Sequence, residues 1–92
     1  MVSIKRSGKK VFDQTKWFEN RNDRNDLISS LKKSNLVIGL RKKEVVALLG
    51  DEMNYVHSSL WTYYIGKKHF FFKRYLLLYF DKEDLVYKIG KN

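Results

Sequence analysis

The chain has 92 residues, 43% of them hydrophobic and 15% aromatic, which is enough apolar surface for one folded domain. It contains no cysteine, and this excludes disulfides, thiolate nucleophiles and thiolate metal sites. Nineteen Lys and Arg against ten Asp and Glu give a formal net charge of +9, which fits a solvated basic surface or attraction to nucleic acid, anionic lipid or an acidic protein.

The first residues are polar and basic, and they predict a flexible arm over residues 1–10 ahead of a single domain over 11–92. No segment reaches the roughly 18 consecutive apolar residues that a membrane helix needs. The basic residues of the arm also interrupt any apolar signal core. The default expectation is therefore a cytoplasmic protein, or a cell-envelope protein if a leader has been removed. Contact with a membrane is expected only if that leader carried a lipid anchor.

The front half of the chain predicts an ordered aromatic lead-in over residues 11–18 and then a first helix. Asp23 or Asn25 is expected to cap the start of this helix. Apolar residues recur on one face from Leu27 to Leu31, and Asn35 is expected to end the helix in the left-handed conformation.

A second helix is predicted over residues 42–49, where apolar side chains again share one face and Gly50 follows as the terminating residue. Arg41 stands where a helix cap is wanted, although its side chain cannot accept a backbone hydrogen bond. Glu44 is expected to reach back to the unpaired backbone N–H as half of a capping box.

The back half is rich in β-branched and aromatic residues and predicts strands over residues 55–65, 70–80 and 85–89. Residues 81–84 form a polar turn, in which Asp81 is expected to accept hydrogen bonds from backbone amides. The predicted fold class is therefore α+β, with two N-terminal helices packed on an antiparallel meander of three to four strands.

Three segments in this order resemble the small domains of the BamE/SmpA-OmlA family and the β-lactamase-inhibitor-like domains. Residues 38–50 resemble the helix signature, 61–66 the aromatic strand after it, and 76–81 with 85–86 the closing hairpin. The resemblance covers about residues 23–90. It implies the same α+β fold and a protein that acts by binding other proteins, including an immunity or inhibitor role.

Two positions depart from that family pattern. Arg41 replaces the usual Ser or Thr cap, and residues 51–53 lack the proline that commonly follows the glycine. The relatives' partners are therefore not carried over. Many relatives are lipid-anchored through an N-terminal cysteine, which this chain lacks.

Candidate catalytic sets are absent from the sequence. His57 and His69 have no metal-ligand spacing, and Ser58 does not lie in a nucleophile turn. The acids of residues 81–84 share one turn and are expected to be solvated. We therefore expect no enzyme activity, no cofactor and no metal.

The aromatic residues of the strands exceed what one helix-covered sheet face can hide, and basic residues flank them. Alternation predicts that Trp61, Tyr63 and Ile65 share one face and Thr62 and Tyr64 the other. Three interpretations stay open: cross-strand pairs that only stabilise the sheet, a protein-binding patch, or a surface that stacks on nucleic-acid bases.

The leading hypothesis is a non-catalytic interaction module that docks a protein with an acidic or amphipathic surface. Nucleic-acid binding and an immunity or inhibitor role are the alternatives. The candidate partner-binding residues are Trp61, Tyr63, Tyr64, Lys73, Arg74 and Tyr75.

Overall fold

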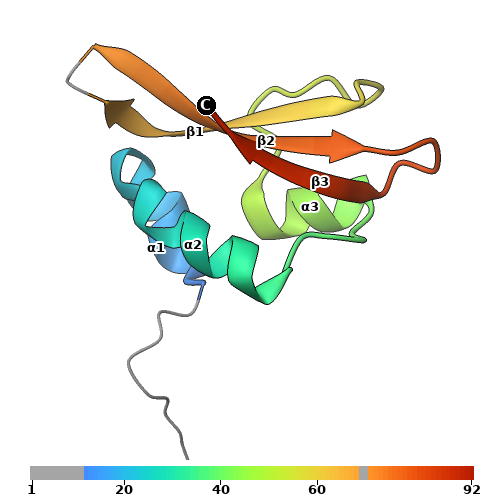
Figure 1. Cartoon of the computed structure of the whole chain (residues 1–92), viewed down its shortest axis with the longest axis horizontal. Coiled ribbons are helices and arrows are strands. Elements are labelled where there is room, and N and C mark those ends of the chain that lie inside the picture. The colour runs from blue at the N-terminus through green and yellow to red at the C-terminus, as the bar shows by residue number, and fades with distance from the viewer. Residues whose placement is uncertain (1–11, 69–70) are drawn as a thin grey trace, which may run out of the picture.

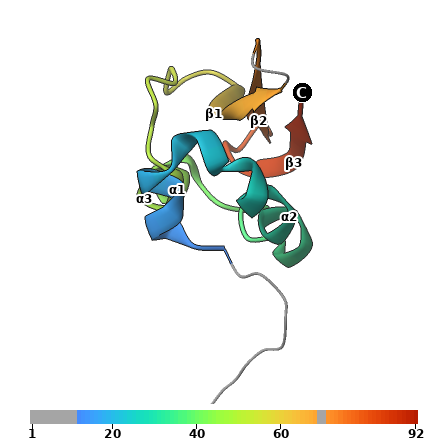
Figure 2. The same cartoon turned by 90° about the vertical axis from the view of Figure 1, so that its left-hand side faces the viewer.

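A computed structural model describes residues 12–68 and 71–92 of the chain. The elements in chain order are α1 (Gln14–Glu19), η1 (Arg21–Asp23), α2 (Asn25–Ser34), α3 (Lys42–Leu49), β1 (Leu60–Lys68), β2 (Phe72–Phe80) and β3 (Val86–Lys91). The strands form one antiparallel sheet in the order β1-β2-β3. The helices all lie on one side of this sheet, and the other side is left open (Figures 1 and 2). The predicted α+β class is confirmed, with three α-helices in place of the expected two.

The additional helix is α1, in the segment for which the sequence predicted only an ordered aromatic lead-in. Asp13 caps it, because its carboxylate accepts a hydrogen bond from the backbone N–H of Lys16 at 3.1 Å. Its one buried residue is Trp17, whose indole N–H donates to the carbonyl oxygen of Leu49 at 3.0 Å. Six residues are too few to display a helical repeat, so α1 has no periodic signal in the sequence.

The helix α2 begins at Asn25, but no side chain caps it. The backbone instead runs directly from η1 through Arg24, which is itself in the right-handed helical conformation. Asn35 ends α2 with a φ of 52°, as predicted.

The helix α3 has the predicted bounds and the predicted one-sided cap. The Glu44 carboxylate accepts a hydrogen bond from the backbone N–H of Arg41 at 2.8 Å, whereas the Arg41 guanidinium has no acceptor to offer in return. Gly50 follows with a positive φ of 86° and a ψ of 174°, so it turns the chain without adopting the left-handed helical conformation.

The sheet has three strands, and its first strand begins later than predicted because residues 55 and 56 lie in the preceding loop. Trp61 pairs with Leu78 and Tyr63 with Leu76, so these side chains share the face that the helices cover. Asp81 accepts hydrogen bonds from the backbone N–H groups of Glu83 and Leu85 at 2.9 and 3.0 Å, which confirms its expected role in the hairpin turn.

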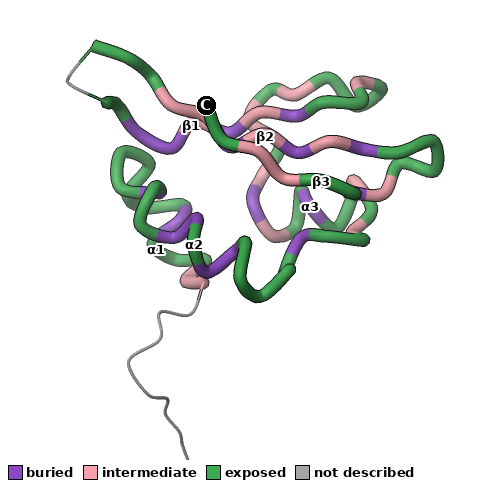
Figure 3. Tube along the Cα trace, in the orientation of Figure 1, coloured by how far each residue is buried: buried purple, intermediate pink, exposed green. Residues whose placement is uncertain are grey.

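The core lies between the helices and this inner face of the sheet, where the buried segments of both layers face one another (Figure 3). Its members are Trp17, Leu27, Ile28, Leu31, Val37, Val45, Leu49, Trp61, Tyr63, Ile65, Leu76, Leu78, Phe80 and Val86. Every indole and phenol in this core has a hydrogen-bond acceptor, since Trp61 donates to the Tyr55 carbonyl at 2.9 Å and Tyr63 to the Gly50 carbonyl at 2.6 Å. The two layers therefore cover each other, as the apolar patterns predict.

The arm predicted over residues 1–10 and the histidine at position 69 lie outside the described residues. Among the helices of the described part of the chain, none is long and apolar enough to cross a membrane.

Candidate interaction site

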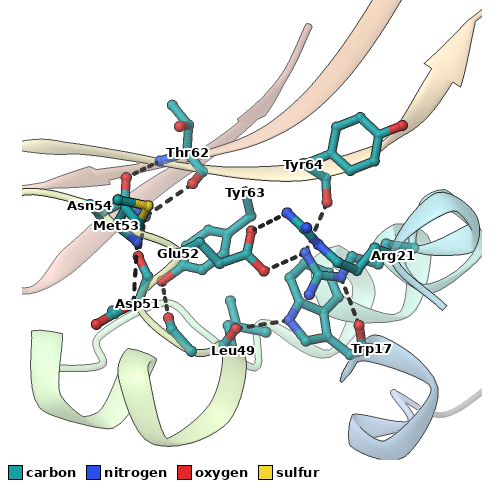
Figure 4. A network of polar contacts seen from close by, with 12 residues as sticks. Trp17, Arg21, Leu49, Asp51, Glu52, Met53, Asn54, Thr62, Tyr63 and Tyr64 are labelled. Atoms are coloured by element: carbon teal, nitrogen blue, oxygen red, sulfur yellow. Dashed lines mark hydrogen bonds and ion pairs between the residues drawn. The ribbon is translucent and has the colours of Figure 1, made fainter. Parts of the chain in front are cut away.

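A buried ion pair between Arg24 and Glu52 joins the helical layer to the loop that precedes β1. Figure 4 shows Glu52 among its polar neighbours, between the helices and the sheet. One guanidinium nitrogen of Arg24 lies 2.6 Å from the Glu52 carboxylate and donates to the Tyr64 carbonyl at 3.0 Å. The Nε of Arg24 donates to the Trp17 carbonyl at 2.7 Å, and the guanidinium lies 4.1 Å from the Trp17 ring centre. Burial lowers the pKa of the Arg24 guanidinium, and the hydrogen bond to Glu52 opposes that change. Arg24 thus holds α1, β1 and the loop in one arrangement.

The loop over residues 51–54 has an unusual backbone at two consecutive positions. Glu52 and Met53 both have positive φ angles, of 44° and 62°, although neither is glycine. This conformation costs on the order of 1–2 kcal/mol per residue, so the surroundings must impose it. The Asp51 carboxylate accepts from the backbone N–H of Met53 at 3.2 Å, and the Asn54 side chain donates to the Thr62 carbonyl and accepts from the Thr62 N–H, each at 3.0 Å.

The consequence of this loop geometry is that Met53 projects into solvent with 97% of its surface exposed. Phe18, on α1, is also exposed, at 47%. Backbone strain held in place by an ion pair is typical of segments that present a side chain for function. A flexible thioether is also a side chain that adapts to many apolar surfaces.

Met53 and Phe18 border an open cleft of about 660 Å³ that extends from the helical layer past β1 to the outer face of the sheet, and we call it the open-face cleft. Its lining residues are Phe18, Arg21, Arg24, Glu52, Met53, Thr62, Tyr64, Lys73 and Tyr75. These residues come from α1, η1, the residue before α2, the loop over residues 51–54, β1 and β2.

Two tyrosines form the floor of the open-face cleft. The rings of Tyr64 and Tyr75 meet edge to face with centres 6.1 Å apart, and the Tyr64 hydroxyl donates to the Asn22 side chain at 2.7 Å. The guanidinium of Arg21 lies 5.6 Å from the Tyr64 ring centre. The one carboxylate of the lining, Glu52, already pairs with Arg24 at 2.6 Å and with Arg21 at 3.6 Å. The cleft therefore combines apolar edges with an excess of positive charge.

The structure brings together three of the six residues that the sequence singled out. Tyr64, Lys73 and Tyr75 line the open-face cleft. Trp61 and Tyr63 are 2% and 0% exposed, because alternation turns them into the core, so they do not belong to any exposed surface.

The sixth residue, Arg74, lies on the helix side of the sheet. Its Nε donates to the carbonyl of Asn92 at 2.8 Å, and it lines a separate small cleft with residues of η1 and α2.

Sequence reasoning missed Phe18, Arg21 and Met53, which form the rim of the open-face cleft. Arg21 lies in an all-polar stretch over residues 20–26 that does not distinguish it from its neighbours. Met53 carries no turn signal because a left-handed residue is usually glycine or asparagine. The alternation of charges over residues 20–26 is the one sequence feature that accompanies Arg21 and Arg24.

Ser58 and His57, which the sequence analysis weighed as catalytic or metal-binding residues, make contacts that support the fold. Ser58 Oγ accepts from the backbone N–H of Leu60 at 3.2 Å and donates to its carbonyl at 2.8 Å, at the start of β1. The His57 ring packs against Tyr55 with centres 5.4 Å apart. Over residues 12–68 and 71–92, no three His, Asp or Glu side chains are grouped so that they could hold a metal ion.

Comparison of the chain with models of protein families, with curated proteins and with solved structures found no match. The resemblance to BamE/SmpA-OmlA and β-lactamase-inhibitor-like domains therefore stays a prediction from sequence.

Proposed function

We propose that this chain is a non-catalytic protein-interaction module, of the BamE/inhibitor-like type, that docks a protein with an acidic and amphipathic surface in the open-face cleft. The observation that carries the proposal is the composition of the rim: exposed Met53 and Phe18 stand beside the cations Arg21 and Lys73. An apolar anchor surrounded by charges is the arrangement found at protein interfaces, where Arg and aromatic residues are enriched.

Charge defines the partner further. The lining holds three cations, Arg21, Arg24 and Lys73, against the single carboxylate of Glu52, in a chain with a net charge of +9. Acidic side chains of a partner would therefore meet complementary potential, which speeds association and selects against basic proteins.

Photo-crosslinking tests the proposal. A photo-reactive residue replaces Met53 in the full chain, which is then mixed with an extract of the source cells and irradiated. We expect one stoichiometric adduct with an acidic protein. The control carries the same crosslinker at position 46, an exposed position on α3 of the helical layer.

Charge reversal then shows whether the cleft itself binds. The double variant Arg21→Glu, Lys73→Glu should weaken binding at least tenfold, or about 1.4 kcal/mol. The matched double variant Lys33→Glu, Lys43→Glu changes the net charge equally on exposed helix positions and should weaken it much less. Equal losses in both double variants, or adducts spread over many proteins from both crosslinker positions, would refute the proposal.

Nucleic-acid binding is a second candidate, favoured by Arg21 and Lys73 beside the two cleft tyrosines. It is weaker, because Tyr64 and Tyr75 meet edge to face and Arg21 already lies over one ring, so they do not form a flat stacking platform. Fluorescence anisotropy with single-stranded and duplex oligonucleotides at two salt concentrations tests it. Binding at low salt that falls steeply as salt rises would support this candidate, and no binding at low salt would eliminate it.

A further inference from the structure

The outer edge of β3 differs from the outer edge of β1. Val86 begins β3 and is paired on its outer side, since its N–H donates to the Leu40 carbonyl at 3.1 Å and its carbonyl accepts from Gly39 at 2.8 Å. At the other end, Asn92 donates to the Tyr75 carbonyl of β2 at 3.2 Å. Backbone N–H and C=O groups alternate in direction along a strand, so residues 90 and 88, two and four positions before Asn92, also direct these groups toward β2.

The register shifts between Tyr79 and Phe80, which leaves Tyr87 in a β-bulge with its ring on Tyr79, on the same face as Lys88. Beyond this bulge, the backbone groups of Ile89 and Lys91 point away from the sheet. Within the part of the chain that the structure describes, these two residues have no backbone hydrogen-bond partner on that side. They form a row of N–H and C=O groups of the kind that pairs with an added strand.

On β1, by contrast, the equivalent groups are covered one by one. Ser58 binds both backbone groups of Leu60, the Asn54 side chain binds both groups of Thr62, and Arg24 binds the carbonyl of Tyr64. From Leu60 to Tyr64 the fold therefore covers one edge of the sheet with side chains, and at Ile89 and Lys91 it leaves the other edge available.

Cations line both faces of the available edge. On the open face, the Lys88 ammonium lies 5.1 Å from the Tyr79 ring centre. On the helix face, the Lys91 ammonium donates to the Asn25 side chain at 2.9 Å. Burial, together with the nearby charges of Arg74 and Lys32, lowers the pKa of Lys91. A strand placed beside β3 would thus have positive charge next to the side chains on each of its faces.

We propose that the outer edge of β3, at Ile89 and Lys91, binds an extended acidic segment of a partner protein as a fourth strand of the sheet. The proposal rests on the proposed function in that the partner is a protein, but it uses a different surface from the open-face cleft. A second copy of this chain is a poorer occupant, because two chains of net charge +9 would bring their lysines together.

The first test uses the full isotope-labelled chain and a capped peptide of about six residues, the usual strand length. The peptide contains valines and glutamates, with at least one glutamate at an odd position and one at an even position, so that each face of the added strand carries negative charge. Saturable binding should slow hydrogen exchange of the Ile89 and Lys91 amides at least tenfold. The amides of Lys88 and Gly90, already turned toward β2, should change little. A peptide with lysine in place of each glutamate should not bind.

Three outcomes would overturn the proposal. One is no saturable binding of the acidic peptide. The second is protection at the open-face cleft, around Tyr64 and Tyr75, with the β3 amides unchanged. The third is concentration-dependent protection of the β3 edge without peptide, accompanied by dimer formation, which would identify a second copy as the occupant.

A pair of double variants separates edge binding from general attraction. The double variant Lys88→Glu, Lys91→Glu should weaken binding of the acidic peptide at least tenfold more than the control does. The control is the double variant Lys67→Glu, Lys68→Glu, which makes the same charge change at exposed positions of β1. Equal weakening would overturn the edge proposal. The same variants are then tested for binding to the partner that crosslinking identifies. If Arg21→Glu, Lys73→Glu loses this binding and Lys88→Glu, Lys91→Glu keeps it, the edge proposal is refuted and the proposed function stands.

Discussion

The two faces of the sheet carry similar residues in different surroundings. On the inner face, Tyr63 is fully buried and its hydroxyl donates to the Gly50 carbonyl at 2.6 Å. Its neighbour Tyr64, on the outer face, packs edge to face on Tyr75 under the guanidinium of Arg21. The first arrangement satisfies every group within the fold, whereas the second leaves rings and cations in contact with solvent.

This difference shows that the role of an aromatic residue in this protein depends on what covers its face of the sheet. Helices cover the inner face, so its tyrosine contributes packing and one internal hydrogen bond. Nothing among the described residues covers the outer face as a layer (Figure 3).

The largest effect is expected at Arg24, which ties the inner layer to the rim of the open-face cleft. Arg24→Leu removes the partner of Glu52 and the donors to the carbonyls of Trp17 and Tyr64, and breaking such a buried pair costs about 3–5 kcal/mol. Arg21→Leu removes the exposed 3.6 Å pair with Glu52 and the contact of the guanidinium with the Tyr64 ring, and it should cost about 1 kcal/mol or less. Urea unfolding of both variants measures the difference, and equal losses would contradict the assigned role of Arg24.

Two neighbouring leucines of β2 compare the faces directly. Leu78→Ala opens a cavity in the core and should lower the free energy of unfolding by about 2–5 kcal/mol. Leu77→Ala, on the half-exposed outer face, should lower it by less than about 1 kcal/mol. Calorimetric or urea unfolding checks both, and a larger loss at Leu77 would reverse the assignment of faces.

Tyr63 gives a smaller effect and a pH dependence. Tyr63→Phe loses one internal hydrogen bond and should cost about 1 kcal/mol at neutral pH, whereas Tyr64→Phe should change stability by less than about 0.5 kcal/mol. Burial raises the pKa of Tyr63 above its ordinary value of 10.0, so the unfolded chain loses this proton first as the pH rises. The free energy of unfolding should therefore fall above about pH 10, and less steeply in Tyr63→Phe. Identical slopes would contradict this explanation.

The smallest stability change is expected at Met53. Met53→Gly relieves the left-handed backbone and should leave stability unchanged or raise it by up to about 1 kcal/mol, while Met53→Ala keeps the strain. Both variants remove the exposed side chain, so both should weaken partner binding. Thermal unfolding and binding measured together test this separation, and a large loss of stability in Met53→Gly would show that the side chain serves the fold.

Much of the framework could be predicted from the sequence because it depends on local patterns. The apolar spacing of residues 42–49 and the glycine after them defined α3, and the polar turn around Asp81 defined the last hairpin. Strict alternation along β1 predicted that Trp61 and Tyr63 share a face opposite Tyr64.

The rest depends on contacts between residues far apart in the sequence. The single short turn of α1 has no periodic signal, and nothing local identifies Glu52 as the partner of Arg24. The sequence also could not say which face of the sheet the helices would cover, so Trp61 and Tyr63 were included among the contact residues. The rim of the open-face cleft arises only when α1, η1 and the loop over residues 51–54 meet.

Hydroxyl-radical footprinting of the free chain, with Met53 in place, and of its complex with the partner that crosslinking identifies tests the central contrast most directly. The account predicts that Tyr64, Tyr75 and Met53 are oxidised in the free chain and protected in the complex, while Trp61 and Tyr63 are protected in both. Oxidation of Trp61 and Tyr63 in the folded free chain, or unchanged oxidation of the outer-face residues in the complex, would contradict it.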